Sequence, residues 1–77
     1  MPQSVYTERY DRLCRLLTRA RQDAGLTQSD LAERLDRPQS YVSKYERRQR
    51  RLDIVELLDV AEALRLDPCD VLRDIMA

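Results

Sequence analysis

The sequence predicts a small all-α protein formed by one domain. Its 77 residues suit a single domain, and its apolar residues recur at three- and four-residue spacing along most of the chain. The composition is 43% apolar and 36% charged, with one glycine, three prolines and no tryptophan or phenylalanine, which favours helices over a sandwich or barrel. A core of this size supplies only a few kcal/mol, on the order of 3 to 5, so dimerisation would help stability.

The first predicted helix starts at Ser4, whose hydroxyl can cap it, and ends at Gly25. One apolar face at alternating spacings of four and three consists of Tyr6, Tyr10, Leu13, Leu17, Ala20 and Ala24. Gly25 supplies the left-handed residue that often terminates a helix, and Leu26 then turns inward. We expect Tyr6 and Tyr10 to pack in or beside the core, with a phosphate contact through the hydroxyl as the alternative.

The second predicted helix begins after Thr27, which can cap it, and ends at Asp36-Arg37-Pro38. Its core stripe is Leu31, Ala32 and Leu35, and its solvent face is Ser29, Asp30, Glu33 and Arg34. Pro38 closes this helix and opens the next, because proline disfavours the helical conformation of the residue before it but suits a helix start.

The third predicted helix, residues 39–47, is short and polar on one side. Only Val42 and Tyr45 have core spacing. The opposite side carries Gln39, Ser40, Ser43, Lys44 and Arg47. Amides can pair bidentately with adenine, lysine with guanine and serine with either, so this face suits the major groove of DNA.

Two further helices complete the prediction. Asp53 can cap the fourth, whose expected core residues are Ile54, Leu57, Leu58, Ala61 and Leu64. Asp67-Pro68 can cap and open the fifth. Its expected apolar side is Val71, Leu72, Ile75 and Met76.

Residues 21–66 resemble the lambda-repressor-like helix-turn-helix domains of the xenobiotic-response-element (XRE) type. The resemblance rests on Arg21, Gly25-Leu26-Thr27-Gln28, Leu31-Ala32, Leu35, Gln39-Ser40-Tyr41-Val42-Ser43, Glu46, Leu52-Asp53 and Glu56-Leu57. It implies a five-helix DNA-binding domain over residues 1–77, with the helix-turn-helix proper at about 27–47. It also implies a transcriptional regulator, usually a repressor that binds a palindromic operator of double-stranded DNA as a homodimer.

The resemblance assigns roles to individual residues. Gln39, Ser40, Ser43 and Lys44 lie where the family contacts bases or the groove, the alternative being an ordinary solvated face. Gln28 lies where a glutamine touches a phosphate and supports the glutamine that opens helix three. Arg21 and Glu46 match a structural ion pair between helices one and three, and we expect that role rather than a DNA contact by Arg21.

The basic residues gather in one segment, although the formal net charge is zero. Residues 37–51 carry six basic side chains against Glu46 alone, whereas residues 52–77 carry seven acidic side chains against two arginines. We expect Arg47, Arg48, Arg50 and Arg51 to bind the DNA backbone, a solvated loop or a partner-binding patch being the alternatives. Four neutralised phosphates per subunit would give a salt slope near −7 for a dimer, at roughly −0.9 per contact.

Three positions depart from the family pattern and bear on geometry. Asp36 and Arg48 stand where glycine is usual, at positions that favour a left-handed backbone. Aspartate tolerates this conformation moderately, whereas arginine does so less well, at a cost of order 1 kcal/mol. Pro38 replaces a capping hydroxyl, which affects where helix three starts and how Gln39 is rotated.

Other functional classes find little support in the sequence. There is no histidine, no metal-type spacing and no glycine-rich phosphate loop, so we expect no enzyme, metal or cofactor. Cys14 and Cys69 are expected to be reduced, partly buried thiols, with a redox pair as the alternative. No apolar run suggests a membrane span or signal peptide, so a cytoplasmic protein is expected. The alternative function is an antitoxin or adaptor whose acidic C-terminal half engages a protein partner.

Overall fold

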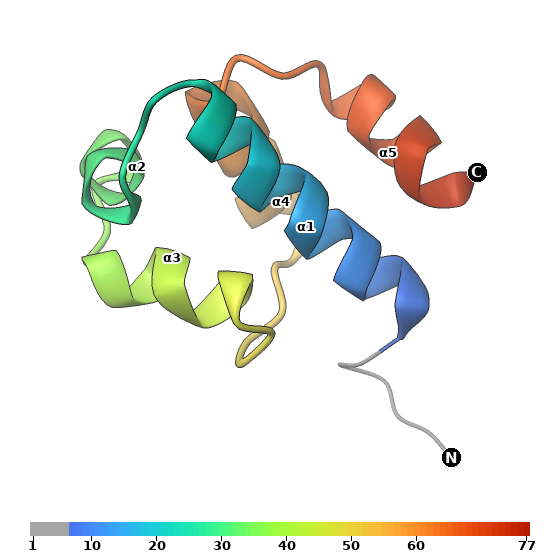
Figure 1. Cartoon of the computed structure of the whole chain (residues 1–77), viewed down its shortest axis with the longest axis horizontal. Coiled ribbons are helices and arrows are strands. Elements are labelled where there is room, and N and C mark those ends of the chain that lie inside the picture. Colours follow the sequence, from blue (N-terminus) through green and yellow to red (C-terminus); the bar gives the residue numbers. More distant parts are fainter. Residues whose placement is uncertain (1–6) are drawn as a thin grey trace.

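Five α-helices follow one another in the computed structural model, which describes residues 7–77 (Figure 1). They are α1 (Glu8–Asp23), α2 (Gln28–Leu35), α3 (Gln39–Glu46), α4 (Ile54–Ala63) and α5 (Pro68–Met76). Helix α1 crosses the middle of the molecule in front of α4, with α5 on one side and α2 and α3 on the other (Figure 1). The all-α prediction with five helices is confirmed.

The helix starts follow the capping residues of the sequence, with one exception. Thr27 caps α2 and Asp53 caps α4, each in a capping box in which the side chain three residues later bonds back to the cap amide. Asp67 caps α5, and Pro68 occupies its first turn. Helix α1 begins later than expected, at Glu8, because Thr7 supplies the cap. The predicted cap Ser4 and the predicted core residue Tyr6 lie outside the described residues.

Among residues 7–77, four have a positive φ, and each follows a helix. Gly25 ends α1 with a φ of 74°, as expected. Asp36 after α2 and Arg48 after α3 adopt φ values of 55° and 61°, so both keep the left-handed backbone for which glycine is usual. Arg65 after α4, with a φ of 58°, was not anticipated.

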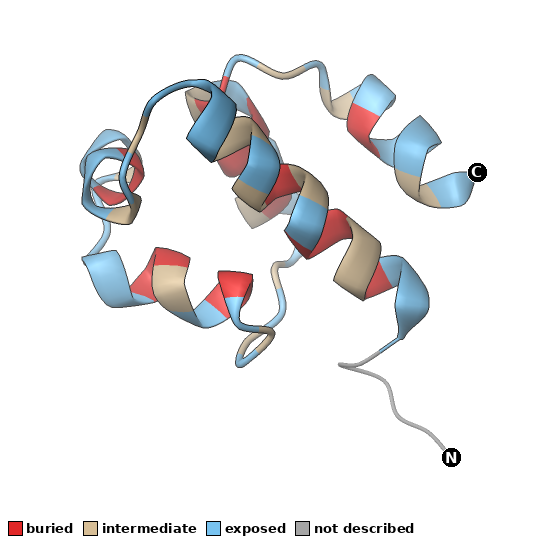
Figure 2. Cartoon of the chain, viewed as in Figure 1, coloured by how far each residue is buried: buried red, intermediate tan, exposed pale blue. Residues whose placement is uncertain are grey.

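The core lies where all five helices face one another (Figure 2). Its fully buried large side chains are Tyr45, Leu17, Leu31, Val42, Val60 and Cys14. Tyr10 is also buried, which confirms core packing for this residue. Tyr41 is buried as well, although the sequence prediction gave only Val42 and Tyr45 of α3 core positions.

The predicted core faces of α4 and α5 were partly wrong. Ile54 and Leu58 are 60% and 45% exposed, while Val60, which was not predicted, is completely buried. Helix α4 carries too many apolar residues for one face, and its contacts with α2 and α5 select Leu57, Val60, Ala61 and Leu64. On α5, Val71 is buried and Ile75 packs against the core, whereas Leu72 and Met76 remain exposed.

The cysteines lie in different environments. Cys14 is buried in the core, where its thiol donates to the carbonyl of Tyr45 at 3.2 Å. Cys69 is exposed on α5 rather than partly buried as predicted, and neither cysteine forms a disulfide. No helix within residues 7–77 is long and apolar enough to cross a membrane.

Candidate nucleic-acid interface

The outer face of α3 presents polar side chains to solvent. Gln39, Ser40 and Lys44 are exposed and Ser43 is half-buried. Val42 and Tyr45 anchor the opposite side of this helix in the core with no exposed surface. Helix α3 therefore holds its four candidate groove-contacting residues on a rigid support.

Gln39 is held by a hydrogen-bond network that reaches into the core. Its Nε2 donates to Oε1 of Gln28 at 2.7 Å, and Nε2 of Gln28 donates to Oε1 of Glu46 at 2.9 Å. Arg21 then donates to both carboxylate oxygens of Glu46, from Nε at 2.8 Å and from Nη2 at 3.1 Å. The network leaves the Oε1 atom of Gln39 as an acceptor at the surface.

Arg21 and Glu46 form a bidentate ion pair between α1 and the end of α3. Their side chains are only 11% and 6% exposed, and Arg21 also donates to the carbonyl of Leu26 at 2.7 Å. The hydrogen bond with Glu46 raises the pKa of Arg21 above its ordinary value, more than burial lowers it. With every contact directed inward, Arg21 fixes the position of α3.

The four candidate arginines after α3 fall into two groups. Arg48 reaches back to Asp11 on α1 at 2.8 Å and donates to the carbonyl of Glu46 at 2.6 Å. Arg50 pairs with Glu56 on α4 at 3.0 Å, and this bond raises the pKa of Arg50. The sequence prediction treated all four as backbone clamps, but Arg48 and Arg50 bind the protein itself in this structure.

The other two arginines lie at the surface. Arg47 is exposed and forms no ion pair with any residue in 7–77. The Arg51 guanidinium lies over the Tyr10 ring, 4.5 Å from its centroid, and the residue is nevertheless exposed. Arg47 therefore presents positive charge directly after α3, and Arg51 lies at the surface against Tyr10 of α1.

Tyr41 contacts two arginines beside this interface, and the sequence prediction missed this residue. The guanidinium carbons of Arg37 and Arg50 lie 4.9 and 4.6 Å from its ring centroid, and Tyr45 packs edge-on at 6.1 Å. Cation–π contacts of this kind restrain the two arginines. The spacing of four residues between Tyr41 and Tyr45 was the signal that could have revealed it, because such residues share a helix face.

The arrangement is suited to binding. Donors, acceptors and cations converge on one surface, and no group of three His, Cys, Asp or Glu side chains within residues 7–77 could hold a metal ion. The start of α3 lacks a side-chain cap because Pro38 precedes it. Its first amides are therefore available to an anion.

Comparisons with known proteins agree with this geometry. The helix-turn-helix family model matches residues 17–71. A solved XRE-family like protein from Pseudomonas syringae pv. tomato is 47% identical, covering 88% of this chain and 83% of that one, with a TM-score of 0.85. The restriction-modification controller protein C.AhdI from Aeromonas hydrophila is 32% identical over 80% of this chain and 94% of its own, with a TM-score of 0.74. The clp gene regulator ClgR from C. glutamicum is 28% identical over 91% of both chains, with a TM-score of 0.80. No curated protein matches the chain in sequence.

Proposed function

Because the chain belongs to the XRE-type helix-turn-helix family of DNA-binding transcription regulators, which are not enzymes, we propose that it is a repressor that binds a palindromic operator as a homodimer. In this proposal α3 enters the major groove and α2 lies across the backbone, the usual docking of a helix-turn-helix.

The fixed position of Gln39 is the observation that carries this proposal. An exposed glutamine at the start of a helix is ordinarily mobile, yet here it is bonded to Gln28, and Gln28 is bonded to the buried Glu46. A side chain that is ordered before binding loses less conformational entropy when it meets a base edge. Gln39 would present its remaining amide groups to adenine, for which a bidentate pair discriminates by about 1 to 3 kcal/mol.

Further contacts would follow from the positions of the neighbouring side chains. Ser40 and Lys44 share the exposed face of α3 with Gln39, and the half-buried Ser43 lies beside them. We assign these residues to base or groove contact. Gln28, at the start of α2, would lie beside a phosphate, because helix N-termini favour anions.

Backbone clamping is assigned to Arg47 and Arg51, while Arg48 and Arg50 support the loop through Asp11 and Glu56. Two neutralised phosphates per subunit would give a dimer a salt slope of roughly −4. Four would give roughly −7. The measured slope therefore reports how many cations reach the DNA.

Dimerisation would use the exposed apolar side chains of the C-terminal half. Analogy with the family points to α5 and the loop before it, with Ile75 and Met76 as contacts. Met76 is 68% exposed, but Ile75 packs against the core. Ile54 and Val55 at the start of α4 are 60% and 61% exposed and extend the available apolar surface. Ile54→Glu and Met76→Glu should each convert the dimer to a monomer, which light scattering measures.

The proposal is tested by selecting bound sequences from a random DNA pool and measuring the winner and a scrambled duplex at several salt concentrations. We expect a palindromic winner with half-sites about 34 Å apart. Gln39→Ala should reduce the preference for the winner about tenfold or more. The control Glu62→Ala, an exposed residue on α4, should leave it unchanged.

Absence of any enriched sequence would contradict operator recognition. That result would favour the adaptor alternative, in which acidic residues of 53–74 bind a protein. Substitution of Gln39 or Lys44 would then leave the activity unchanged.

A further inference from the structure

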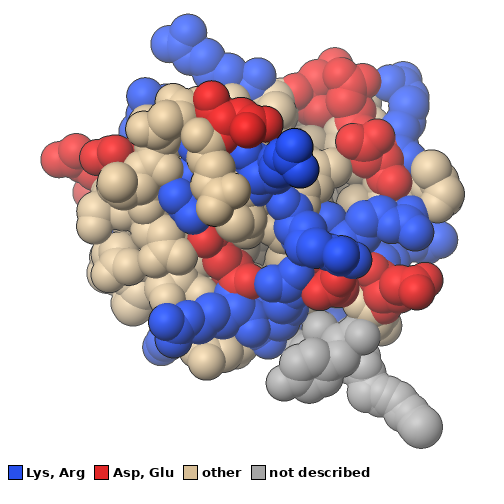
Figure 3. Space-filling model, in the orientation of Figure 1, with Lys and Arg blue, Asp and Glu red and all other residues tan. Residues whose placement is uncertain are grey.

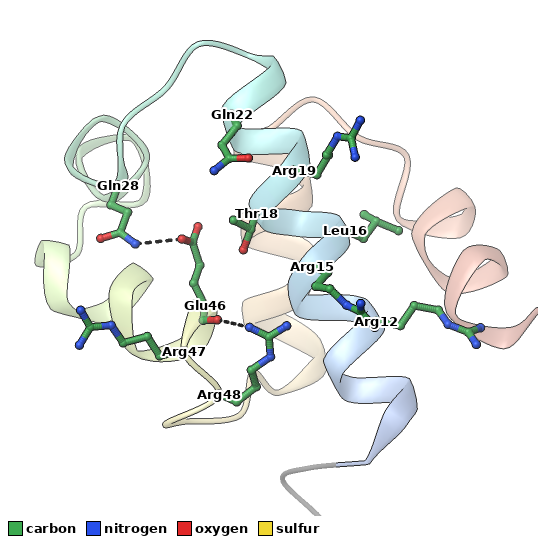
Figure 4. A pocket seen from close by; sticks show the side chains of 10 residues that line it. All are labelled: Arg12, Arg15, Leu16, Thr18, Arg19, Gln22, Gln28, Glu46, Arg47 and Arg48. Carbon is green, nitrogen blue, oxygen red and sulfur yellow. Dashed lines mark hydrogen bonds between the residues drawn. The ribbon is translucent and has the colours of Figure 1, made fainter.

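An arginine-rich cleft lies between α1 and the end of α3. It has a volume of about 670 Å³. Its charged lining consists of Arg12, Arg15, Arg19, Arg47, Arg48 and Glu46. Thr18 and Gln22 project from α1 on the side of Glu46 and Gln28, whereas Arg12 and Arg19 extend toward the opposite side of α1 (Figure 4).

The single carboxylate in the lining does not offset this positive charge. Glu46 is already neutralised by Arg21 and receives a further hydrogen bond from Gln28. The lining of the cleft therefore carries a net positive charge, and on the face shown in Figure 3 basic side chains are interspersed with acidic ones. Such a concentration of charge with low-dielectric walls attracts anions.

The arginines at the rim differ in how firmly the protein holds them. Arg12 donates to the carbonyl of Ala77 at 2.6 Å, which ties it to the end of α5. Arg15 pairs with Asp11 at 2.7 Å, but Asp11 also pairs with Arg48, and the Arg15 side chain is 69% exposed. Arg19 is 81% exposed and its pair with Asp23 is 4.0 Å long. Arg15 and Arg19 can consequently turn toward a ligand at little cost.

The position of the cleft identifies a matching ligand. Gln28 and Arg47, both assigned above to the DNA backbone, also line this cleft together with Arg15 and Arg19. A phosphodiester chain carries charge at regular intervals and needs cations spaced along its path. Arg15 and Arg19 lie one helical turn apart on α1, at the i, i+4 spacing that places side chains on the same face.

We propose that Arg15 and Arg19 of this cleft bind phosphates of the operator backbone beyond those contacted from α3 and its loop. The inference rests on the proposed function and extends it, by giving α1 a direct part in DNA binding. Together with Arg47 and Arg51, these two arginines would bring the phosphate contacts to four per subunit and the salt slope of a dimer to roughly −7.

The test compares the wild-type protein with the double variant Arg15→Gln and Arg19→Gln on the selected operator and on scrambled DNA. Loss of two contacts per subunit should make the salt slope of a dimer less steep by roughly 3.6. Affinity should fall by the same factor on both duplexes, because phosphate contacts carry no sequence information. The charge-conserving variant Arg15→Lys and Arg19→Lys should keep the wild-type slope.

Arg73→Gln is the matched control, since Arg73 also forms an exposed surface pair, with Asp70 at 3.0 Å, but on α5. It should leave the slope unchanged, and thermal melting should show that all variants fold. An unchanged slope in the double variant would overturn the inference, as would a loss confined to the selected operator. If the wild-type protein itself selects no DNA sequence, the proposed function fails instead, so the two failures are distinguishable.

Discussion

The outer face of α3 and the arginine loop of residues 47–51 adjoin each other, and both were predicted to contact DNA. Their side chains nevertheless differ in exposure and in the protein contacts that they form. On α3, Gln39, Ser40 and Lys44 all remain exposed. In the loop, Arg48 and Arg50 are drawn onto Asp11 and Glu56, which lie on α1 and α4. A run of like charges therefore divides into a part that holds the fold and a part that faces solvent.

The difference follows from what determines the direction of each side chain. On a helix, burial of Val42 and Tyr45 fixes which residues point outward, and the spacing in the sequence reveals this. In a loop, the backbone sets no such period. The left-handed Arg48, with a φ of 61°, turns the chain so that successive arginines meet different neighbours. Charge alone does not show which arginine reaches a ligand.

Substitution of Glu46 should have the largest effect on stability, because Glu46 contacts both regions. Its side chain holds Arg21 and Gln28, and its carbonyl accepts from Arg48. Glu46→Ala would leave Arg21 buried without its partner, which should lower the free energy of unfolding by about 3 kcal/mol. Urea denaturation measures this loss. Glu33→Ala on the exposed face of α2 is the control and should change it by less than about 0.5 kcal/mol. Equal losses in both variants would show that the ion pair contributes nothing specific.

Substitutions of Arg47 and Arg48 should have smaller effects, the first on DNA binding and the second on stability. Arg47→Gln should make the salt slope of DNA binding less steep by about 0.9 per subunit and leave stability nearly unchanged. Arg48→Gln should instead lower the free energy of unfolding by about 1 kcal/mol, because it breaks the contact with Asp11. Measuring both quantities for both variants tests the division within the loop. A reduced slope without lost stability in Arg48→Gln would mean that this arginine leaves Asp11 when DNA binds.

The fold was predictable from the sequence where local signals agree with packing. Thr27, Asp53 and Asp67 mark helix starts, and Gly25 and Asp36 mark helix ends, because these residues satisfy helix-terminal groups whatever surrounds them. The buried face of α4 was not predictable in full. Ile54, Leu58 and Val60 are all apolar, so only contact with α2 and α5 decides which of them is buried.

The candidate site shows the same limit. The polar face of α3 was visible as a pattern in the sequence, and the pairing of Arg21 with Glu46 was expected from family resemblance. The contacts of Arg48 and Arg50 depend on residues at least six positions away, Asp11 and Glu56, and on a ring of Tyr41 that was not assigned to the core. Long side chains such as arginine reach partners that no local spacing identifies.

The smallest effect we expect is a pH dependence of stability, in which Glu56, the partner of Arg50 in the loop, is compared with Asp30, which contacts neither region. The backbone hydrogen bond from Thr27 lowers the pKa of Asp30 in the capping box of α2. The backbone hydrogen bond from Asp53, and then Arg50, lower the pKa of Glu56 in the box of α4. Both folded pKa values lie below the unfolded ones, so the stabilisation is complete above the unfolded pKa and is lost as the pH falls through the folded value.

Stability should therefore decline as the pH falls below about 4.5, and Asp30→Asn or Glu56→Gln should each make the curve flatter. Urea denaturation across this pH range measures the change. Added salt should reduce the Glu56 contribution more than that of Asp30, because salt screens the ion pair with Arg50 but hardly affects a short backbone hydrogen bond. Parallel pH curves for the wild type and Glu56→Gln would show that Arg50 is not held by Glu56 in solution. Arg50 would then rejoin Arg47 among the cations available to DNA.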